Sequence, residues 1–491
     1  MKLKALMIII FLIIPVIEEM YVLPAESQST SSQNLSFINF IKEMFENVKD
    51  LSENRCRYNA VDDLNQRLDT IKIVENPKGG YLGIYHYSPT GHSRDFNVYL
   101  ATSIELLNWK FNRTIEEEAS QPTIAQAPNG AYIVAFEKHV FIGTKEERHL
   151  GFYYFPNLTS LLTNSSAYKF IASLTVAVQL EGTPNIYNIT IENSIMKVCV
   201  GFHYNNAFGL DRVAVGHLTI PLDNPQGMIW NCTTPQSDYN QKLLKINPNI
   251  KGHIGDRDYG QIFGRNFSLQ EAQYVKGDWG TWKIFLYDHT TRNFTSVNIK
   301  THKGSTSFGN PTFTFLKSPN GKDCIVVTYF LFSEGAETGE AGELIFYKEF
   351  KTERFPVPYR GKGYPIYVTS NSTISALNCN ESERSINFNV SGPDGSKGYC
   401  IANLTNSLVQ DLWSGNYMVL LDGKTWQFEN WTDIENTYIY INYIHSAHEI
   451  TIIPELSMLF SIIFMLTTFV VVLARKMPSN RGRSGRLGKN D

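Results

Sequence analysis

The sequence lacks the short motifs that mark several large classes of enzyme. It contains no HExxH pair for zinc, no Gly-rich loop that would hold nucleotide phosphates, and no Ser nucleophile in a Gly-x-Ser-x-Gly turn. Zinc proteolysis and ATP-dependent chemistry therefore have no support in the sequence. We expect neither a metal nor a cofactor.

An excess of charge of one sign is also lacking. The chain of 491 residues carries 44 Lys and Arg residues against 47 Asp and Glu residues, a formal net charge of −3. Such a balance gives no global electrostatic attraction to nucleic acid or to acidic polymers. Nucleic acid is therefore not an expected partner.

Helical periodicity is scarce. Residues 26–55 are predicted to form a linker with one amphipathic helix, because apolar residues recur there at helical spacing. They are Phe37, Phe40, Ile41, Met44, Phe45, Val48 and Leu51. After this segment, short runs rich in Val, Ile, Tyr and Phe alternate with Gly, Pro and Asn turns, a pattern typical of strands. The sequence therefore predicts an all-β fold.

Long apolar runs occur at the two ends of the chain. Residues 1–25 follow the plan of an export signal, in which lysines precede an apolar stretch and small residues follow it. The run 456–474 is long enough for a transmembrane helix, and the basic tail 475–491 favours a cytoplasmic C-terminus. We expect a single-pass protein of the cell surface with an extracellular N-terminal domain.

Asn-x-Ser/Thr triplets are frequent, as expected for an exported glycoprotein. The predicted glycosylation sites are Asn112, Asn157, Asn188, Asn266, Asn293, Asn371, Asn389 and Asn403.

An internal repeat is the most informative pattern in the chain. Gln121-Pro122, Thr183-Pro184 and Asn310-Pro311 each begin a strand that leads through a turn into a stronger strand. Asp62-Asp63 and Asp256-Arg257-Asp258 begin two less regular copies. A unit that recurs about every 55 to 75 residues indicates a propeller or another repeated sheet. We count five units and predict a five-bladed β-propeller over residues 56–350.

The blade rhythm resembles that of the five-bladed β-propellers in the glycoside hydrolase class that contains arabinanases. Val98 to Trp109 also looks like the Ser-x-Asp-Leu-x-x-Trp pattern of such blades, with Glu105 shifted from the acid. The resemblance implies a sugar site where the first strands of the blades meet. We expect these residues at its mouth: Asp62, Asp63, Gln121, Glu181, Thr183, His203, Asp256, Arg257, Asp258 and Asn310.

The resemblance also implies catalytic roles, because glycosidases use a pair of carboxyl groups. Glu181 would be the acid, since Glu181-Gly182-Thr183-Pro184 looks like the motif of the proton donor. Asp62 or Asp63 would be the base. Gln121 stands where the family has a further carboxylate, and it cannot ionise.

Several other polar residues have a simpler interpretation. An Asp at a strand start often forms a turn by accepting bonds from its own backbone, which is the alternative for Asp62 and Asp63. Asp256-Arg257-Asp258 could be an ion-pair cluster between blades. Glu137 and His139 are interpreted as rim residues, and the segment 334–343 as a solvated hairpin loop.

The C-terminal part resembles the membrane-proximal β-sandwich of archaeal surface proteins. The similarity covers residues 360–452, including Phe388 to Gly392 and Tyr438 to Ile450. In those proteins the sandwich precedes a Pro-Glu motif and a terminal helix, and Pro454-Glu455 stands in that place. The resemblance implies that the terminal helix is a sorting signal.

Cysteines are few. The six of them permit three disulfides, and their spacing fits no zinc ribbon. We predict Cys379 with Cys400 across a hairpin, Cys199 with Cys232 within one blade, and Cys56 with Cys324 closing the ring.

Two functions remain open from the sequence. The first is binding, and hydrolysis, of an extracellular glycan at the central channel. The second is a non-catalytic adhesion or cell-wall protein that uses the propeller as a platform for other proteins, such as surface-layer components. The separation of the predicted acids distinguishes them.

Overall fold

The computed structural model describes residues 36–163, 165–232 and 237–455. The predicted export signal 1–25, membrane helix 456–474 and tail 475–491 lie outside these residues. Within the described ranges, no helix combines the length and apolar character needed to cross a membrane.

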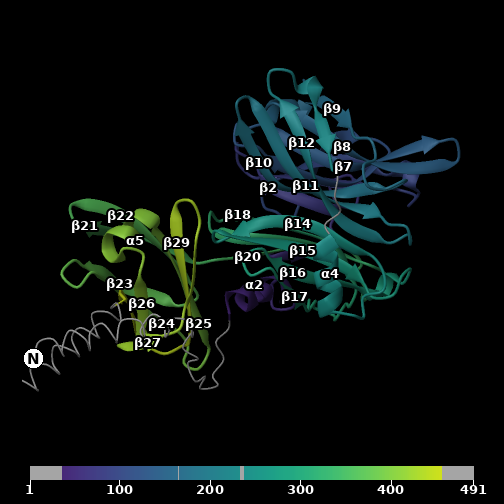
Figure 1. Cartoon of the computed structure of the whole chain (residues 1–491). Helices are drawn as coiled ribbons and strands as arrows, with labels where there is room; N and C mark the ends of the chain where they lie inside the picture. The colour runs from purple at the N-terminus through teal and green to yellow at the C-terminus, as the bar shows by residue number, and fades with distance from the viewer. Residues whose placement is uncertain (1–35, 164, 233–236, 456–491) are drawn as a thin grey trace, which may run out of the picture. The chain divides into compact units, whose positions relative to one another are not determined.

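The chain is mostly β, as predicted, and Figure 1 shows its strands. Residues up to 349 form five four-stranded antiparallel sheets, which we call sheets I to V. Sheet I contains β2 (Asp69–Glu75), β3 (Tyr81–Tyr87), β4 (Asn97–Ser103) and β5 (Lys110–Glu116). Sheet II contains β6 (Ala119–Gln126), β7 (Tyr132–Ile142), β8 (Lys145–Phe155) and β9 (Tyr168–Ile171). Sheet III contains β10 (Glu181–Glu192), β11 (Ile195–Asn205), β12 (Asp211–Pro221) and β13 (Ile229–Asn231). Sheet IV contains β14 (Ile254–Ile262), β15 (Arg265–Gln273), β16 (Trp282–Asp288) and β17 (Asn293–Val297). Sheet V contains β18 (Phe308–Lys317), β19 (Asp323–Leu331), β20 (Gly342–Glu349) and β1 (Cys56–Arg57).

The five sheets form a closed ring. Their first strands contact one another in the order β2, β6, β10, β14, β18 and back to β2. The N-terminal strand β1 pairs with β20, with Cys56 opposite Phe346. A strand from the beginning of the described chain therefore completes sheet V, whose other three strands are the last of the ring in sequence. Because the ring is closed, each of the five sheets contacts a neighbouring sheet on both sides.

The repeated polar-Pro motif forms a bulge in the first strand of a sheet. Pairing with the second strand is interrupted between Ser120 and Thr123 in sheet II, and at the same place in sheets III and V. Gln121, Thr183 and Asn310 each have a positive φ there, of 52°, 49° and 48°. The following proline is tolerated because a residue in a bulge need not donate to the ladder.

Two five-stranded sheets follow the ring. One has the order β21 (Thr352–Tyr359), β22 (Lys362–Ser370), β25 (Lys397–Thr405), β29 (Asn436–Ile444), β28 (Glu429–Thr432). The other has the order β23 (Thr373–Asn380), β24 (Ser385–Ser391), β30 (His448–Pro454), β26 (Tyr417–Leu421), β27 (Lys424–Trp426). Both contribute to one buried apolar cluster, which also takes in α5 (Asn406–Trp413). Alternating burial along these strands explains the cluster, because every second side chain points inward.

Among the described residues the other helices are α2 (Phe37–Glu46), α3 (Leu158–Thr163) and α4 (Ser237–Ile246), with short 3₁₀ turns at Ser93–Asp95, Pro225–Gly227 and Trp279–Thr281. Helix α2 lies within the predicted amphipathic segment. Its apolar face contacts both parts of the chain: the Phe37 ring lies 4.2 Å from Trp431 and 6.2 Å from Phe267 between centroids. The Arg265 guanidinium lies 5.5 Å from the centre of the Phe37 ring. The helix therefore joins sheet IV to the C-terminal sheets through an aromatic core.

The predicted disulfides do not form, since no disulfide is present among the six cysteines. Cys56 on β1 and Cys324 on β19 are separated by β20, and Cys199 on β11 is separated by β12 from the segment that carries Cys232. Two strand spacings of about 4.8 Å exceed the Cα separation that a disulfide allows.

The third predicted pairing is wrong for a different reason. Cys379 lies on β23 and Cys400 on β25, which belong to different sheets and are not the two arms of one hairpin.

We predict that Phe37→Ala lowers the free energy of unfolding by about 3 to 5 kcal/mol, because Phe37 is fully buried and its loss leaves a cavity among aromatic rings. Chemical denaturation followed by tryptophan fluorescence measures the change. Phe208→Ala is the matched control at a side chain that is 80% exposed, and it should change stability by no more than about 0.5 kcal/mol. Equal effects of the two substitutions would contradict the role of α2.

Candidate functional site

The bulges of the five first strands place one polar residue from each sheet at the mouth of the ring. We call these residues the mouth positions. They are Thr70, Gln121, Thr183, Arg257 and Asn310. Four of them have a positive φ, and Arg257 lies in a shorter bulge between Asp256 and Asp258. Gln121 and Asn310 are partly exposed, whereas the other three are buried.

Hydrogen bonds link four mouth positions across the ring. The Arg257 Nη2 group of sheet IV donates to Gln121 Oε1 of sheet II at 2.7 Å. The Thr70 hydroxyl also points at Gln121 Oε1, at 3.5 Å. Arg257 Nε lies 3.7 Å from Glu271 Oε1, and Glu271 Oε2 accepts the Asn310 backbone N–H at 2.5 Å. Gln121, which cannot ionise, is therefore the acceptor for a buried cation.

Glu181, the predicted acid, does not face the mouth. Its Oε1 accepts the backbone N–H groups of Thr175, Val176 and Ala177 at 2.7, 2.5 and 3.0 Å. The side chain is buried, and it fastens the loop that leads into β10. Three backbone donors on one oxygen suit a structural anion better than a proton donor.

Asp62 and Asp63, the predicted bases, lie before sheet I. Asp62 Oδ1 accepts the backbone N–H groups of Leu64 and Gln66, both at 2.9 Å, and its Oδ2 accepts the Tyr85 hydroxyl at 2.5 Å. Asp63 Oδ1 accepts the Phe111 N–H at 2.7 Å. The Asp62 bonds to Leu64 and Gln66 are those of a turn-forming Asp, whereas the Asp63 bond reaches strand β5. The mouth position of sheet I is instead Thr70, which lies in the bulge near the start of β2.

Asp256 and Asp258 lie deeper in the ring. The Lys72 ammonium of sheet I donates to Asp258 Oδ2 at 2.5 Å and to the Phe313 carbonyl at 2.7 Å. Sheet V lies between sheets I and IV, so this buried ion pair connects two sheets that are not neighbours in the ring. Asp256 Oδ1 accepts the Asn185 amide at 3.0 Å.

A repeated contact between neighbouring sheets uses the titratable residues that sequence reasoning missed. Glu343 Oε2 accepts the Thr70 N–H at 3.0 Å, and His86 Nδ1 accepts the Gln121 N–H at 3.2 Å. The predicted site residue His203 belongs to the same set, because its Nε2 lies 3.1 Å from the Asp256 carbonyl oxygen. In each case a side chain of one sheet reaches the bulge of the next sheet in the ring.

Glu137 supplies the corresponding contact between sheets II and III. A Cβ on Gly182 would lie 1.9 Å from Glu137 Oε2, so only glycine fits there. Glu137 is also bonded to Arg148 at 2.9 Å and to the Ser120 hydroxyl at 3.3 Å. Glu137 and His139 are both buried, which corrects their interpretation as rim residues. Glu340 and Glu343 are buried as well, so the segment 334–343 is only partly a solvated loop.

Burial dominates the electrostatics of these groups. It raises the pKa of Glu271 and moves the pKa of Glu343 well above its usual range. Burial lowers the pKa of His86 to about 3 and that of His203 to about 4, so both imidazoles are neutral at pH 7. Burial would raise the pKa of Glu137 too, but the Arg148 charge and the bond to His139 hold it well below the usual range.

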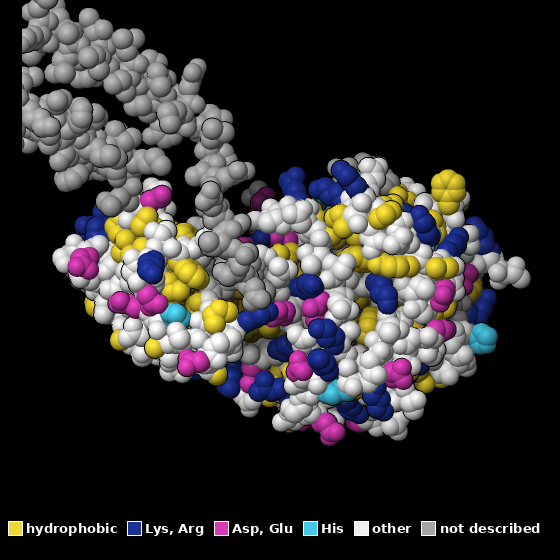
Figure 2. Space-filling view, turned by 90° about the horizontal axis from the view of Figure 1, so that it is seen from below, with side chains coloured by type: hydrophobic (Ala, Val, Ile, Leu, Met, Phe, Trp, Pro, Cys, Tyr) yellow, Lys and Arg dark blue, Asp and Glu magenta, His cyan; other side chains and the backbone are white. Residues whose placement is uncertain are grey.

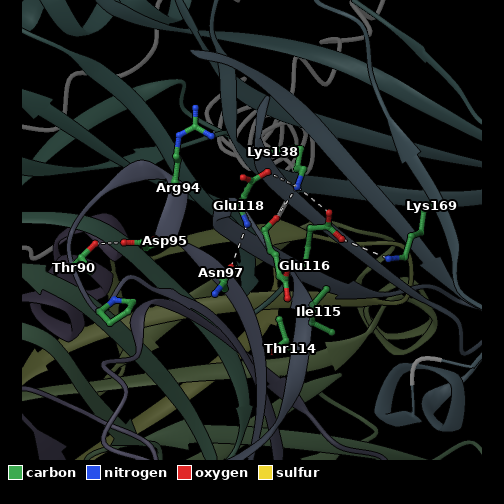
Figure 3. Close-up of a pocket in the computed structure, with 12 residues that line it drawn as sticks. Thr90, Arg94, Asp95, Asn97, Thr114, Ile115, Glu116, Glu118, Lys138 and Lys169 are labelled. Carbon is green, nitrogen blue, oxygen red and sulfur yellow. Dashed lines mark hydrogen bonds and ion pairs between the residues drawn. The ribbon is translucent and has the colours of Figure 1, made fainter. Parts of the chain in front are cut away.

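A groove of about 770 Å³ lies where sheet I meets sheet II (Figure 3). Lys138 points between Glu116 and Glu118, at 3.1 and 4.0 Å, and donates to the Glu117 carbonyl at 2.7 Å. Lys169 lies 3.5 Å from Glu116. The charges compensate one another, and none of the predicted site residues lines the groove. Basic and acidic side chains are also interspersed on the face shown in Figure 2.

Comparison with known proteins gives neither a family nor a curated relative. No family model matches the chain. No curated protein matches it either. Solved structures that it resembles include a thermostable family-43 glycoside hydrolase, with 11% identity, 62% of this chain and 94% of that chain covered, and a TM-score of 0.40. Another is an α-L-arabinofuranosidase from Lactobacillus brevis, with 10% identity, 60% of this chain and 93% of that chain covered, and a TM-score of 0.39. A third is an exo-β-1,3-galactanase from Phanerochaete chrysosporium, with 8% identity, 81% of this chain and 96% of that chain covered, and a TM-score of 0.33. TM-scores below 0.5 establish no shared site, and the ring of sheets rests on this chain's own strand pairing.

We predict that Asp69→Asn stabilises the protein at neutral pH. Burial raises the pKa of Asp69 to about 6, against the attraction of Arg67, so ionising this carboxyl disfavours the folded state. The stability of the native chain due to Asp69 is fully present below about pH 4 and is lost as the pH rises through about 6. The variant should therefore gain about 2 to 3 kcal/mol over the native chain between pH 4 and 7.

Urea unfolding of both proteins at several pH values measures this difference. Asp394→Asn, at an exposed turn, controls for the removal of one negative charge. A difference that shrinks with rising pH would contradict the prediction.

We predict that Lys72→Met lowers the free energy of unfolding by about 3 to 5 kcal/mol, because it leaves Asp258 buried without its cation. The double variant Lys72→Met/Asp258→Asn should be more stable than Lys72→Met alone, since the uncompensated charge is removed. Lys322→Met is the matched control and should cost at most about 1 kcal/mol, because Lys322 is exposed and its partner Glu349 still pairs with Arg55. Denaturant unfolding of the native chain and of the three variants measures these free energies.

Proposed function

We propose that the chain is a cell-surface protein that binds an extracellular carbohydrate at the mouth of the ring without hydrolysing it. In this proposal the five sheets are the blades of a propeller over residues 56–350, and the two C-terminal sheets are a β-sandwich over residues 360–452.

The separate placement of the predicted acids carries the proposal. Hydrolysis of a glycosidic bond needs two carboxyl groups that face the same bond, about 5 to 10 Å apart. Glu181 is held by three backbone N–H groups in one loop, and Asp62 is held by two others in a separate turn. Neither carboxylate can turn toward a common ligand without giving up these bonds. The mouth positions themselves carry hydroxyl, amide and guanidinium groups.

The exposed groups at the mouth suit the hydroxyls of a sugar. Gln121 Oε1 is bonded to Arg257, but the Gln121 amide nitrogen and the Asn310 side chain make no hydrogen bond within the described residues. Both amides are partly exposed, so they can donate to and accept from a ligand. Arg257 orients Gln121, and Glu271 orients Asn310 through its backbone.

The surface location rests on the sequence of the two ends and on the predicted glycosylation sites. Six of these sites are exposed: Asn112, Asn157, Asn188, Asn293, Asn371 and Asn389. Asn266 and Asn403 are partly buried. A transferase could reach the exposed amides on a folded ring, whereas the other two would need modification before folding.

The second candidate function is a platform that binds other proteins. Arg257, Thr70 and Thr183 are buried, and so is the ion pair of Lys72 with Asp258. A shallow, polar mouth of this kind would also suit a flat protein partner. Surface-layer components are the partners that this function implies.

We predict that Asn310→Gly abolishes glycan binding while the fold is retained, because glycine keeps the positive φ of 48° and removes only the amide. A glycan array probed with the full chain, followed by calorimetry on each hit, measures binding. Asn193→Gly is the matched control, since Asn193 has a φ of 50° in the exposed turn between β10 and β11. No glycan bound by the native chain would favour the platform.

Hydrolysis is tested on the same hits. We expect no release of reducing sugar by the native chain, and no change in binding by Glu181→Gln, because Glu181 does not face the mouth. Turnover by the native chain that Glu181→Gln abolishes would restore the enzymatic function.

A further inference from the structure

Three aromatic rings form a ledge beside the mouth. We call Trp279, Trp282 and Phe332 the aromatic ledge. Trp279 lies in the turn between β15 and β16, Trp282 begins β16, and Phe332 follows β19. The ring centroids are 6.2 Å apart for Trp279 and Trp282, 5.1 Å for Trp279 and Phe332, and 6.1 Å for Trp282 and Phe332. Trp279 is 49% exposed, an unusual state for the largest apolar side chain.

The ledge is held in place from behind. The Ser307 hydroxyl donates to the Trp279 carbonyl at 2.5 Å, and Asp278 accepts the Gly280 N–H at 2.9 Å, which fixes the turn. The His253 ring stacks on Trp282 at 6.2 Å with an interplanar angle of 21°. An exposed ring on a fixed support loses little conformational entropy when a ligand binds.

The ledge also begins directly beside a mouth position. A Cβ on Gly309 would lie 2.5 Å from the Phe332 ring, and 3.3 Å from Glu271 Oε2. The next residue is Asn310, whose N–H donates to that same Glu271 oxygen. The aromatic surface and the exposed amide are therefore neighbours on sheets IV and V.

The geometry favours a flat ligand over a cation. Trp279 is the exposed ring of the three, because Trp282 is only 7% exposed and stacks on the partly buried Phe332 ring at 28°, so the ledge presents one ring face and not the walls of a cage. Cages for quaternary ammonium groups surround the cation with ring faces. An apolar face with amide groups at its edge matches a pyranose ring, which has a C–H face and hydroxyls around its rim.

We propose that the aromatic ledge is a second sugar subsite, so that the ligand is an oligosaccharide. One sugar ring hydrogen-bonds to Gln121 and Asn310 at the mouth, and the next stacks its C–H face on Trp279. This inference rests on the proposed carbohydrate binding and specifies its substrate class.

The experiment compares binding of a monosaccharide with that of its oligomers. The probes are gluco-, galacto-, manno-, xylo- and arabino-oligosaccharides of one to six units, titrated by calorimetry into the full-length protein. Trp279→Ala should weaken binding of oligomers by at least tenfold and leave monosaccharide binding unchanged. Trp279→Phe should restore most of the oligomer affinity. Tyr367→Ala, at a 39% exposed ring of the C-terminal sheets, is the control and should bind as the native chain does.

A spectroscopic readout separates stacking from a structural role. Oligomers should change the tryptophan fluorescence of the native chain and of Asn193→Gly, and this change should be lost in Trp279→Phe although binding persists. If oligomer binding requires Asn310 but Trp279→Ala leaves the oligomer affinity unchanged, the ledge is not a sugar subsite, whereas carbohydrate binding at the mouth stands. Binding of choline in place of the sugars would overturn the subsite as well. Absence of all saccharide binding by the native chain would remove the proposed function, and the subsite with it.

Discussion

The ring depends on one kind of contact, in which a side chain from the inner part of one sheet reaches the bulge of the next. Glu343, His86 and Glu271 accept backbone N–H groups at three bulges, His203 meets a carbonyl at a fourth, and Glu137 packs on Gly182 at the fifth. A bulge leaves an N–H or C=O outside the ladder, and a buried group of that kind must find a partner. Four of these contacts therefore satisfy the backbone and join two sheets at once, whereas Glu137 joins sheets II and III by packing.

This constraint also determines what chemistry the ring can support. The buried carboxyl groups described above are bonded to backbone donors, to cations, as Asp258 is to Lys72, or to a side-chain amide, as Asp256 is to Asn185. A general acid needs a pKa near the working pH and freedom to meet the substrate. Groups that hold the fold together cannot leave their partners to do so. The groups that stay accessible at the mouth are the side-chain amides of Gln121 and Asn310. An amide can recognise a ligand by hydrogen bonds but cannot exchange a proton with it.

The sequence predicted the β class, the helix near Phe37 and the repeat, because alternating apolar residues and the polar-Pro motif are local signals. It located Gln121, Thr183 and Asn310 at the mouth for the same reason. It missed Thr70, since no proline marks that bulge, and it misplaced Glu181, whose three donors come from a loop that no pattern identifies. The disulfide predictions were wrong because strand order is set by long-range pairing, which the spacing of cysteines does not reveal.

Strand β1 joins β20 across nearly the whole length of the ring, with Arg57 opposite Ile345. During synthesis, β1 therefore has no strand to pair with until β20 has emerged. Contacts of such large sequence separation slow folding, and the unpaired margin of β20 is open to association with other chains during that interval. The sealing of the ring is consequently a late event in folding and the step most exposed to aggregation.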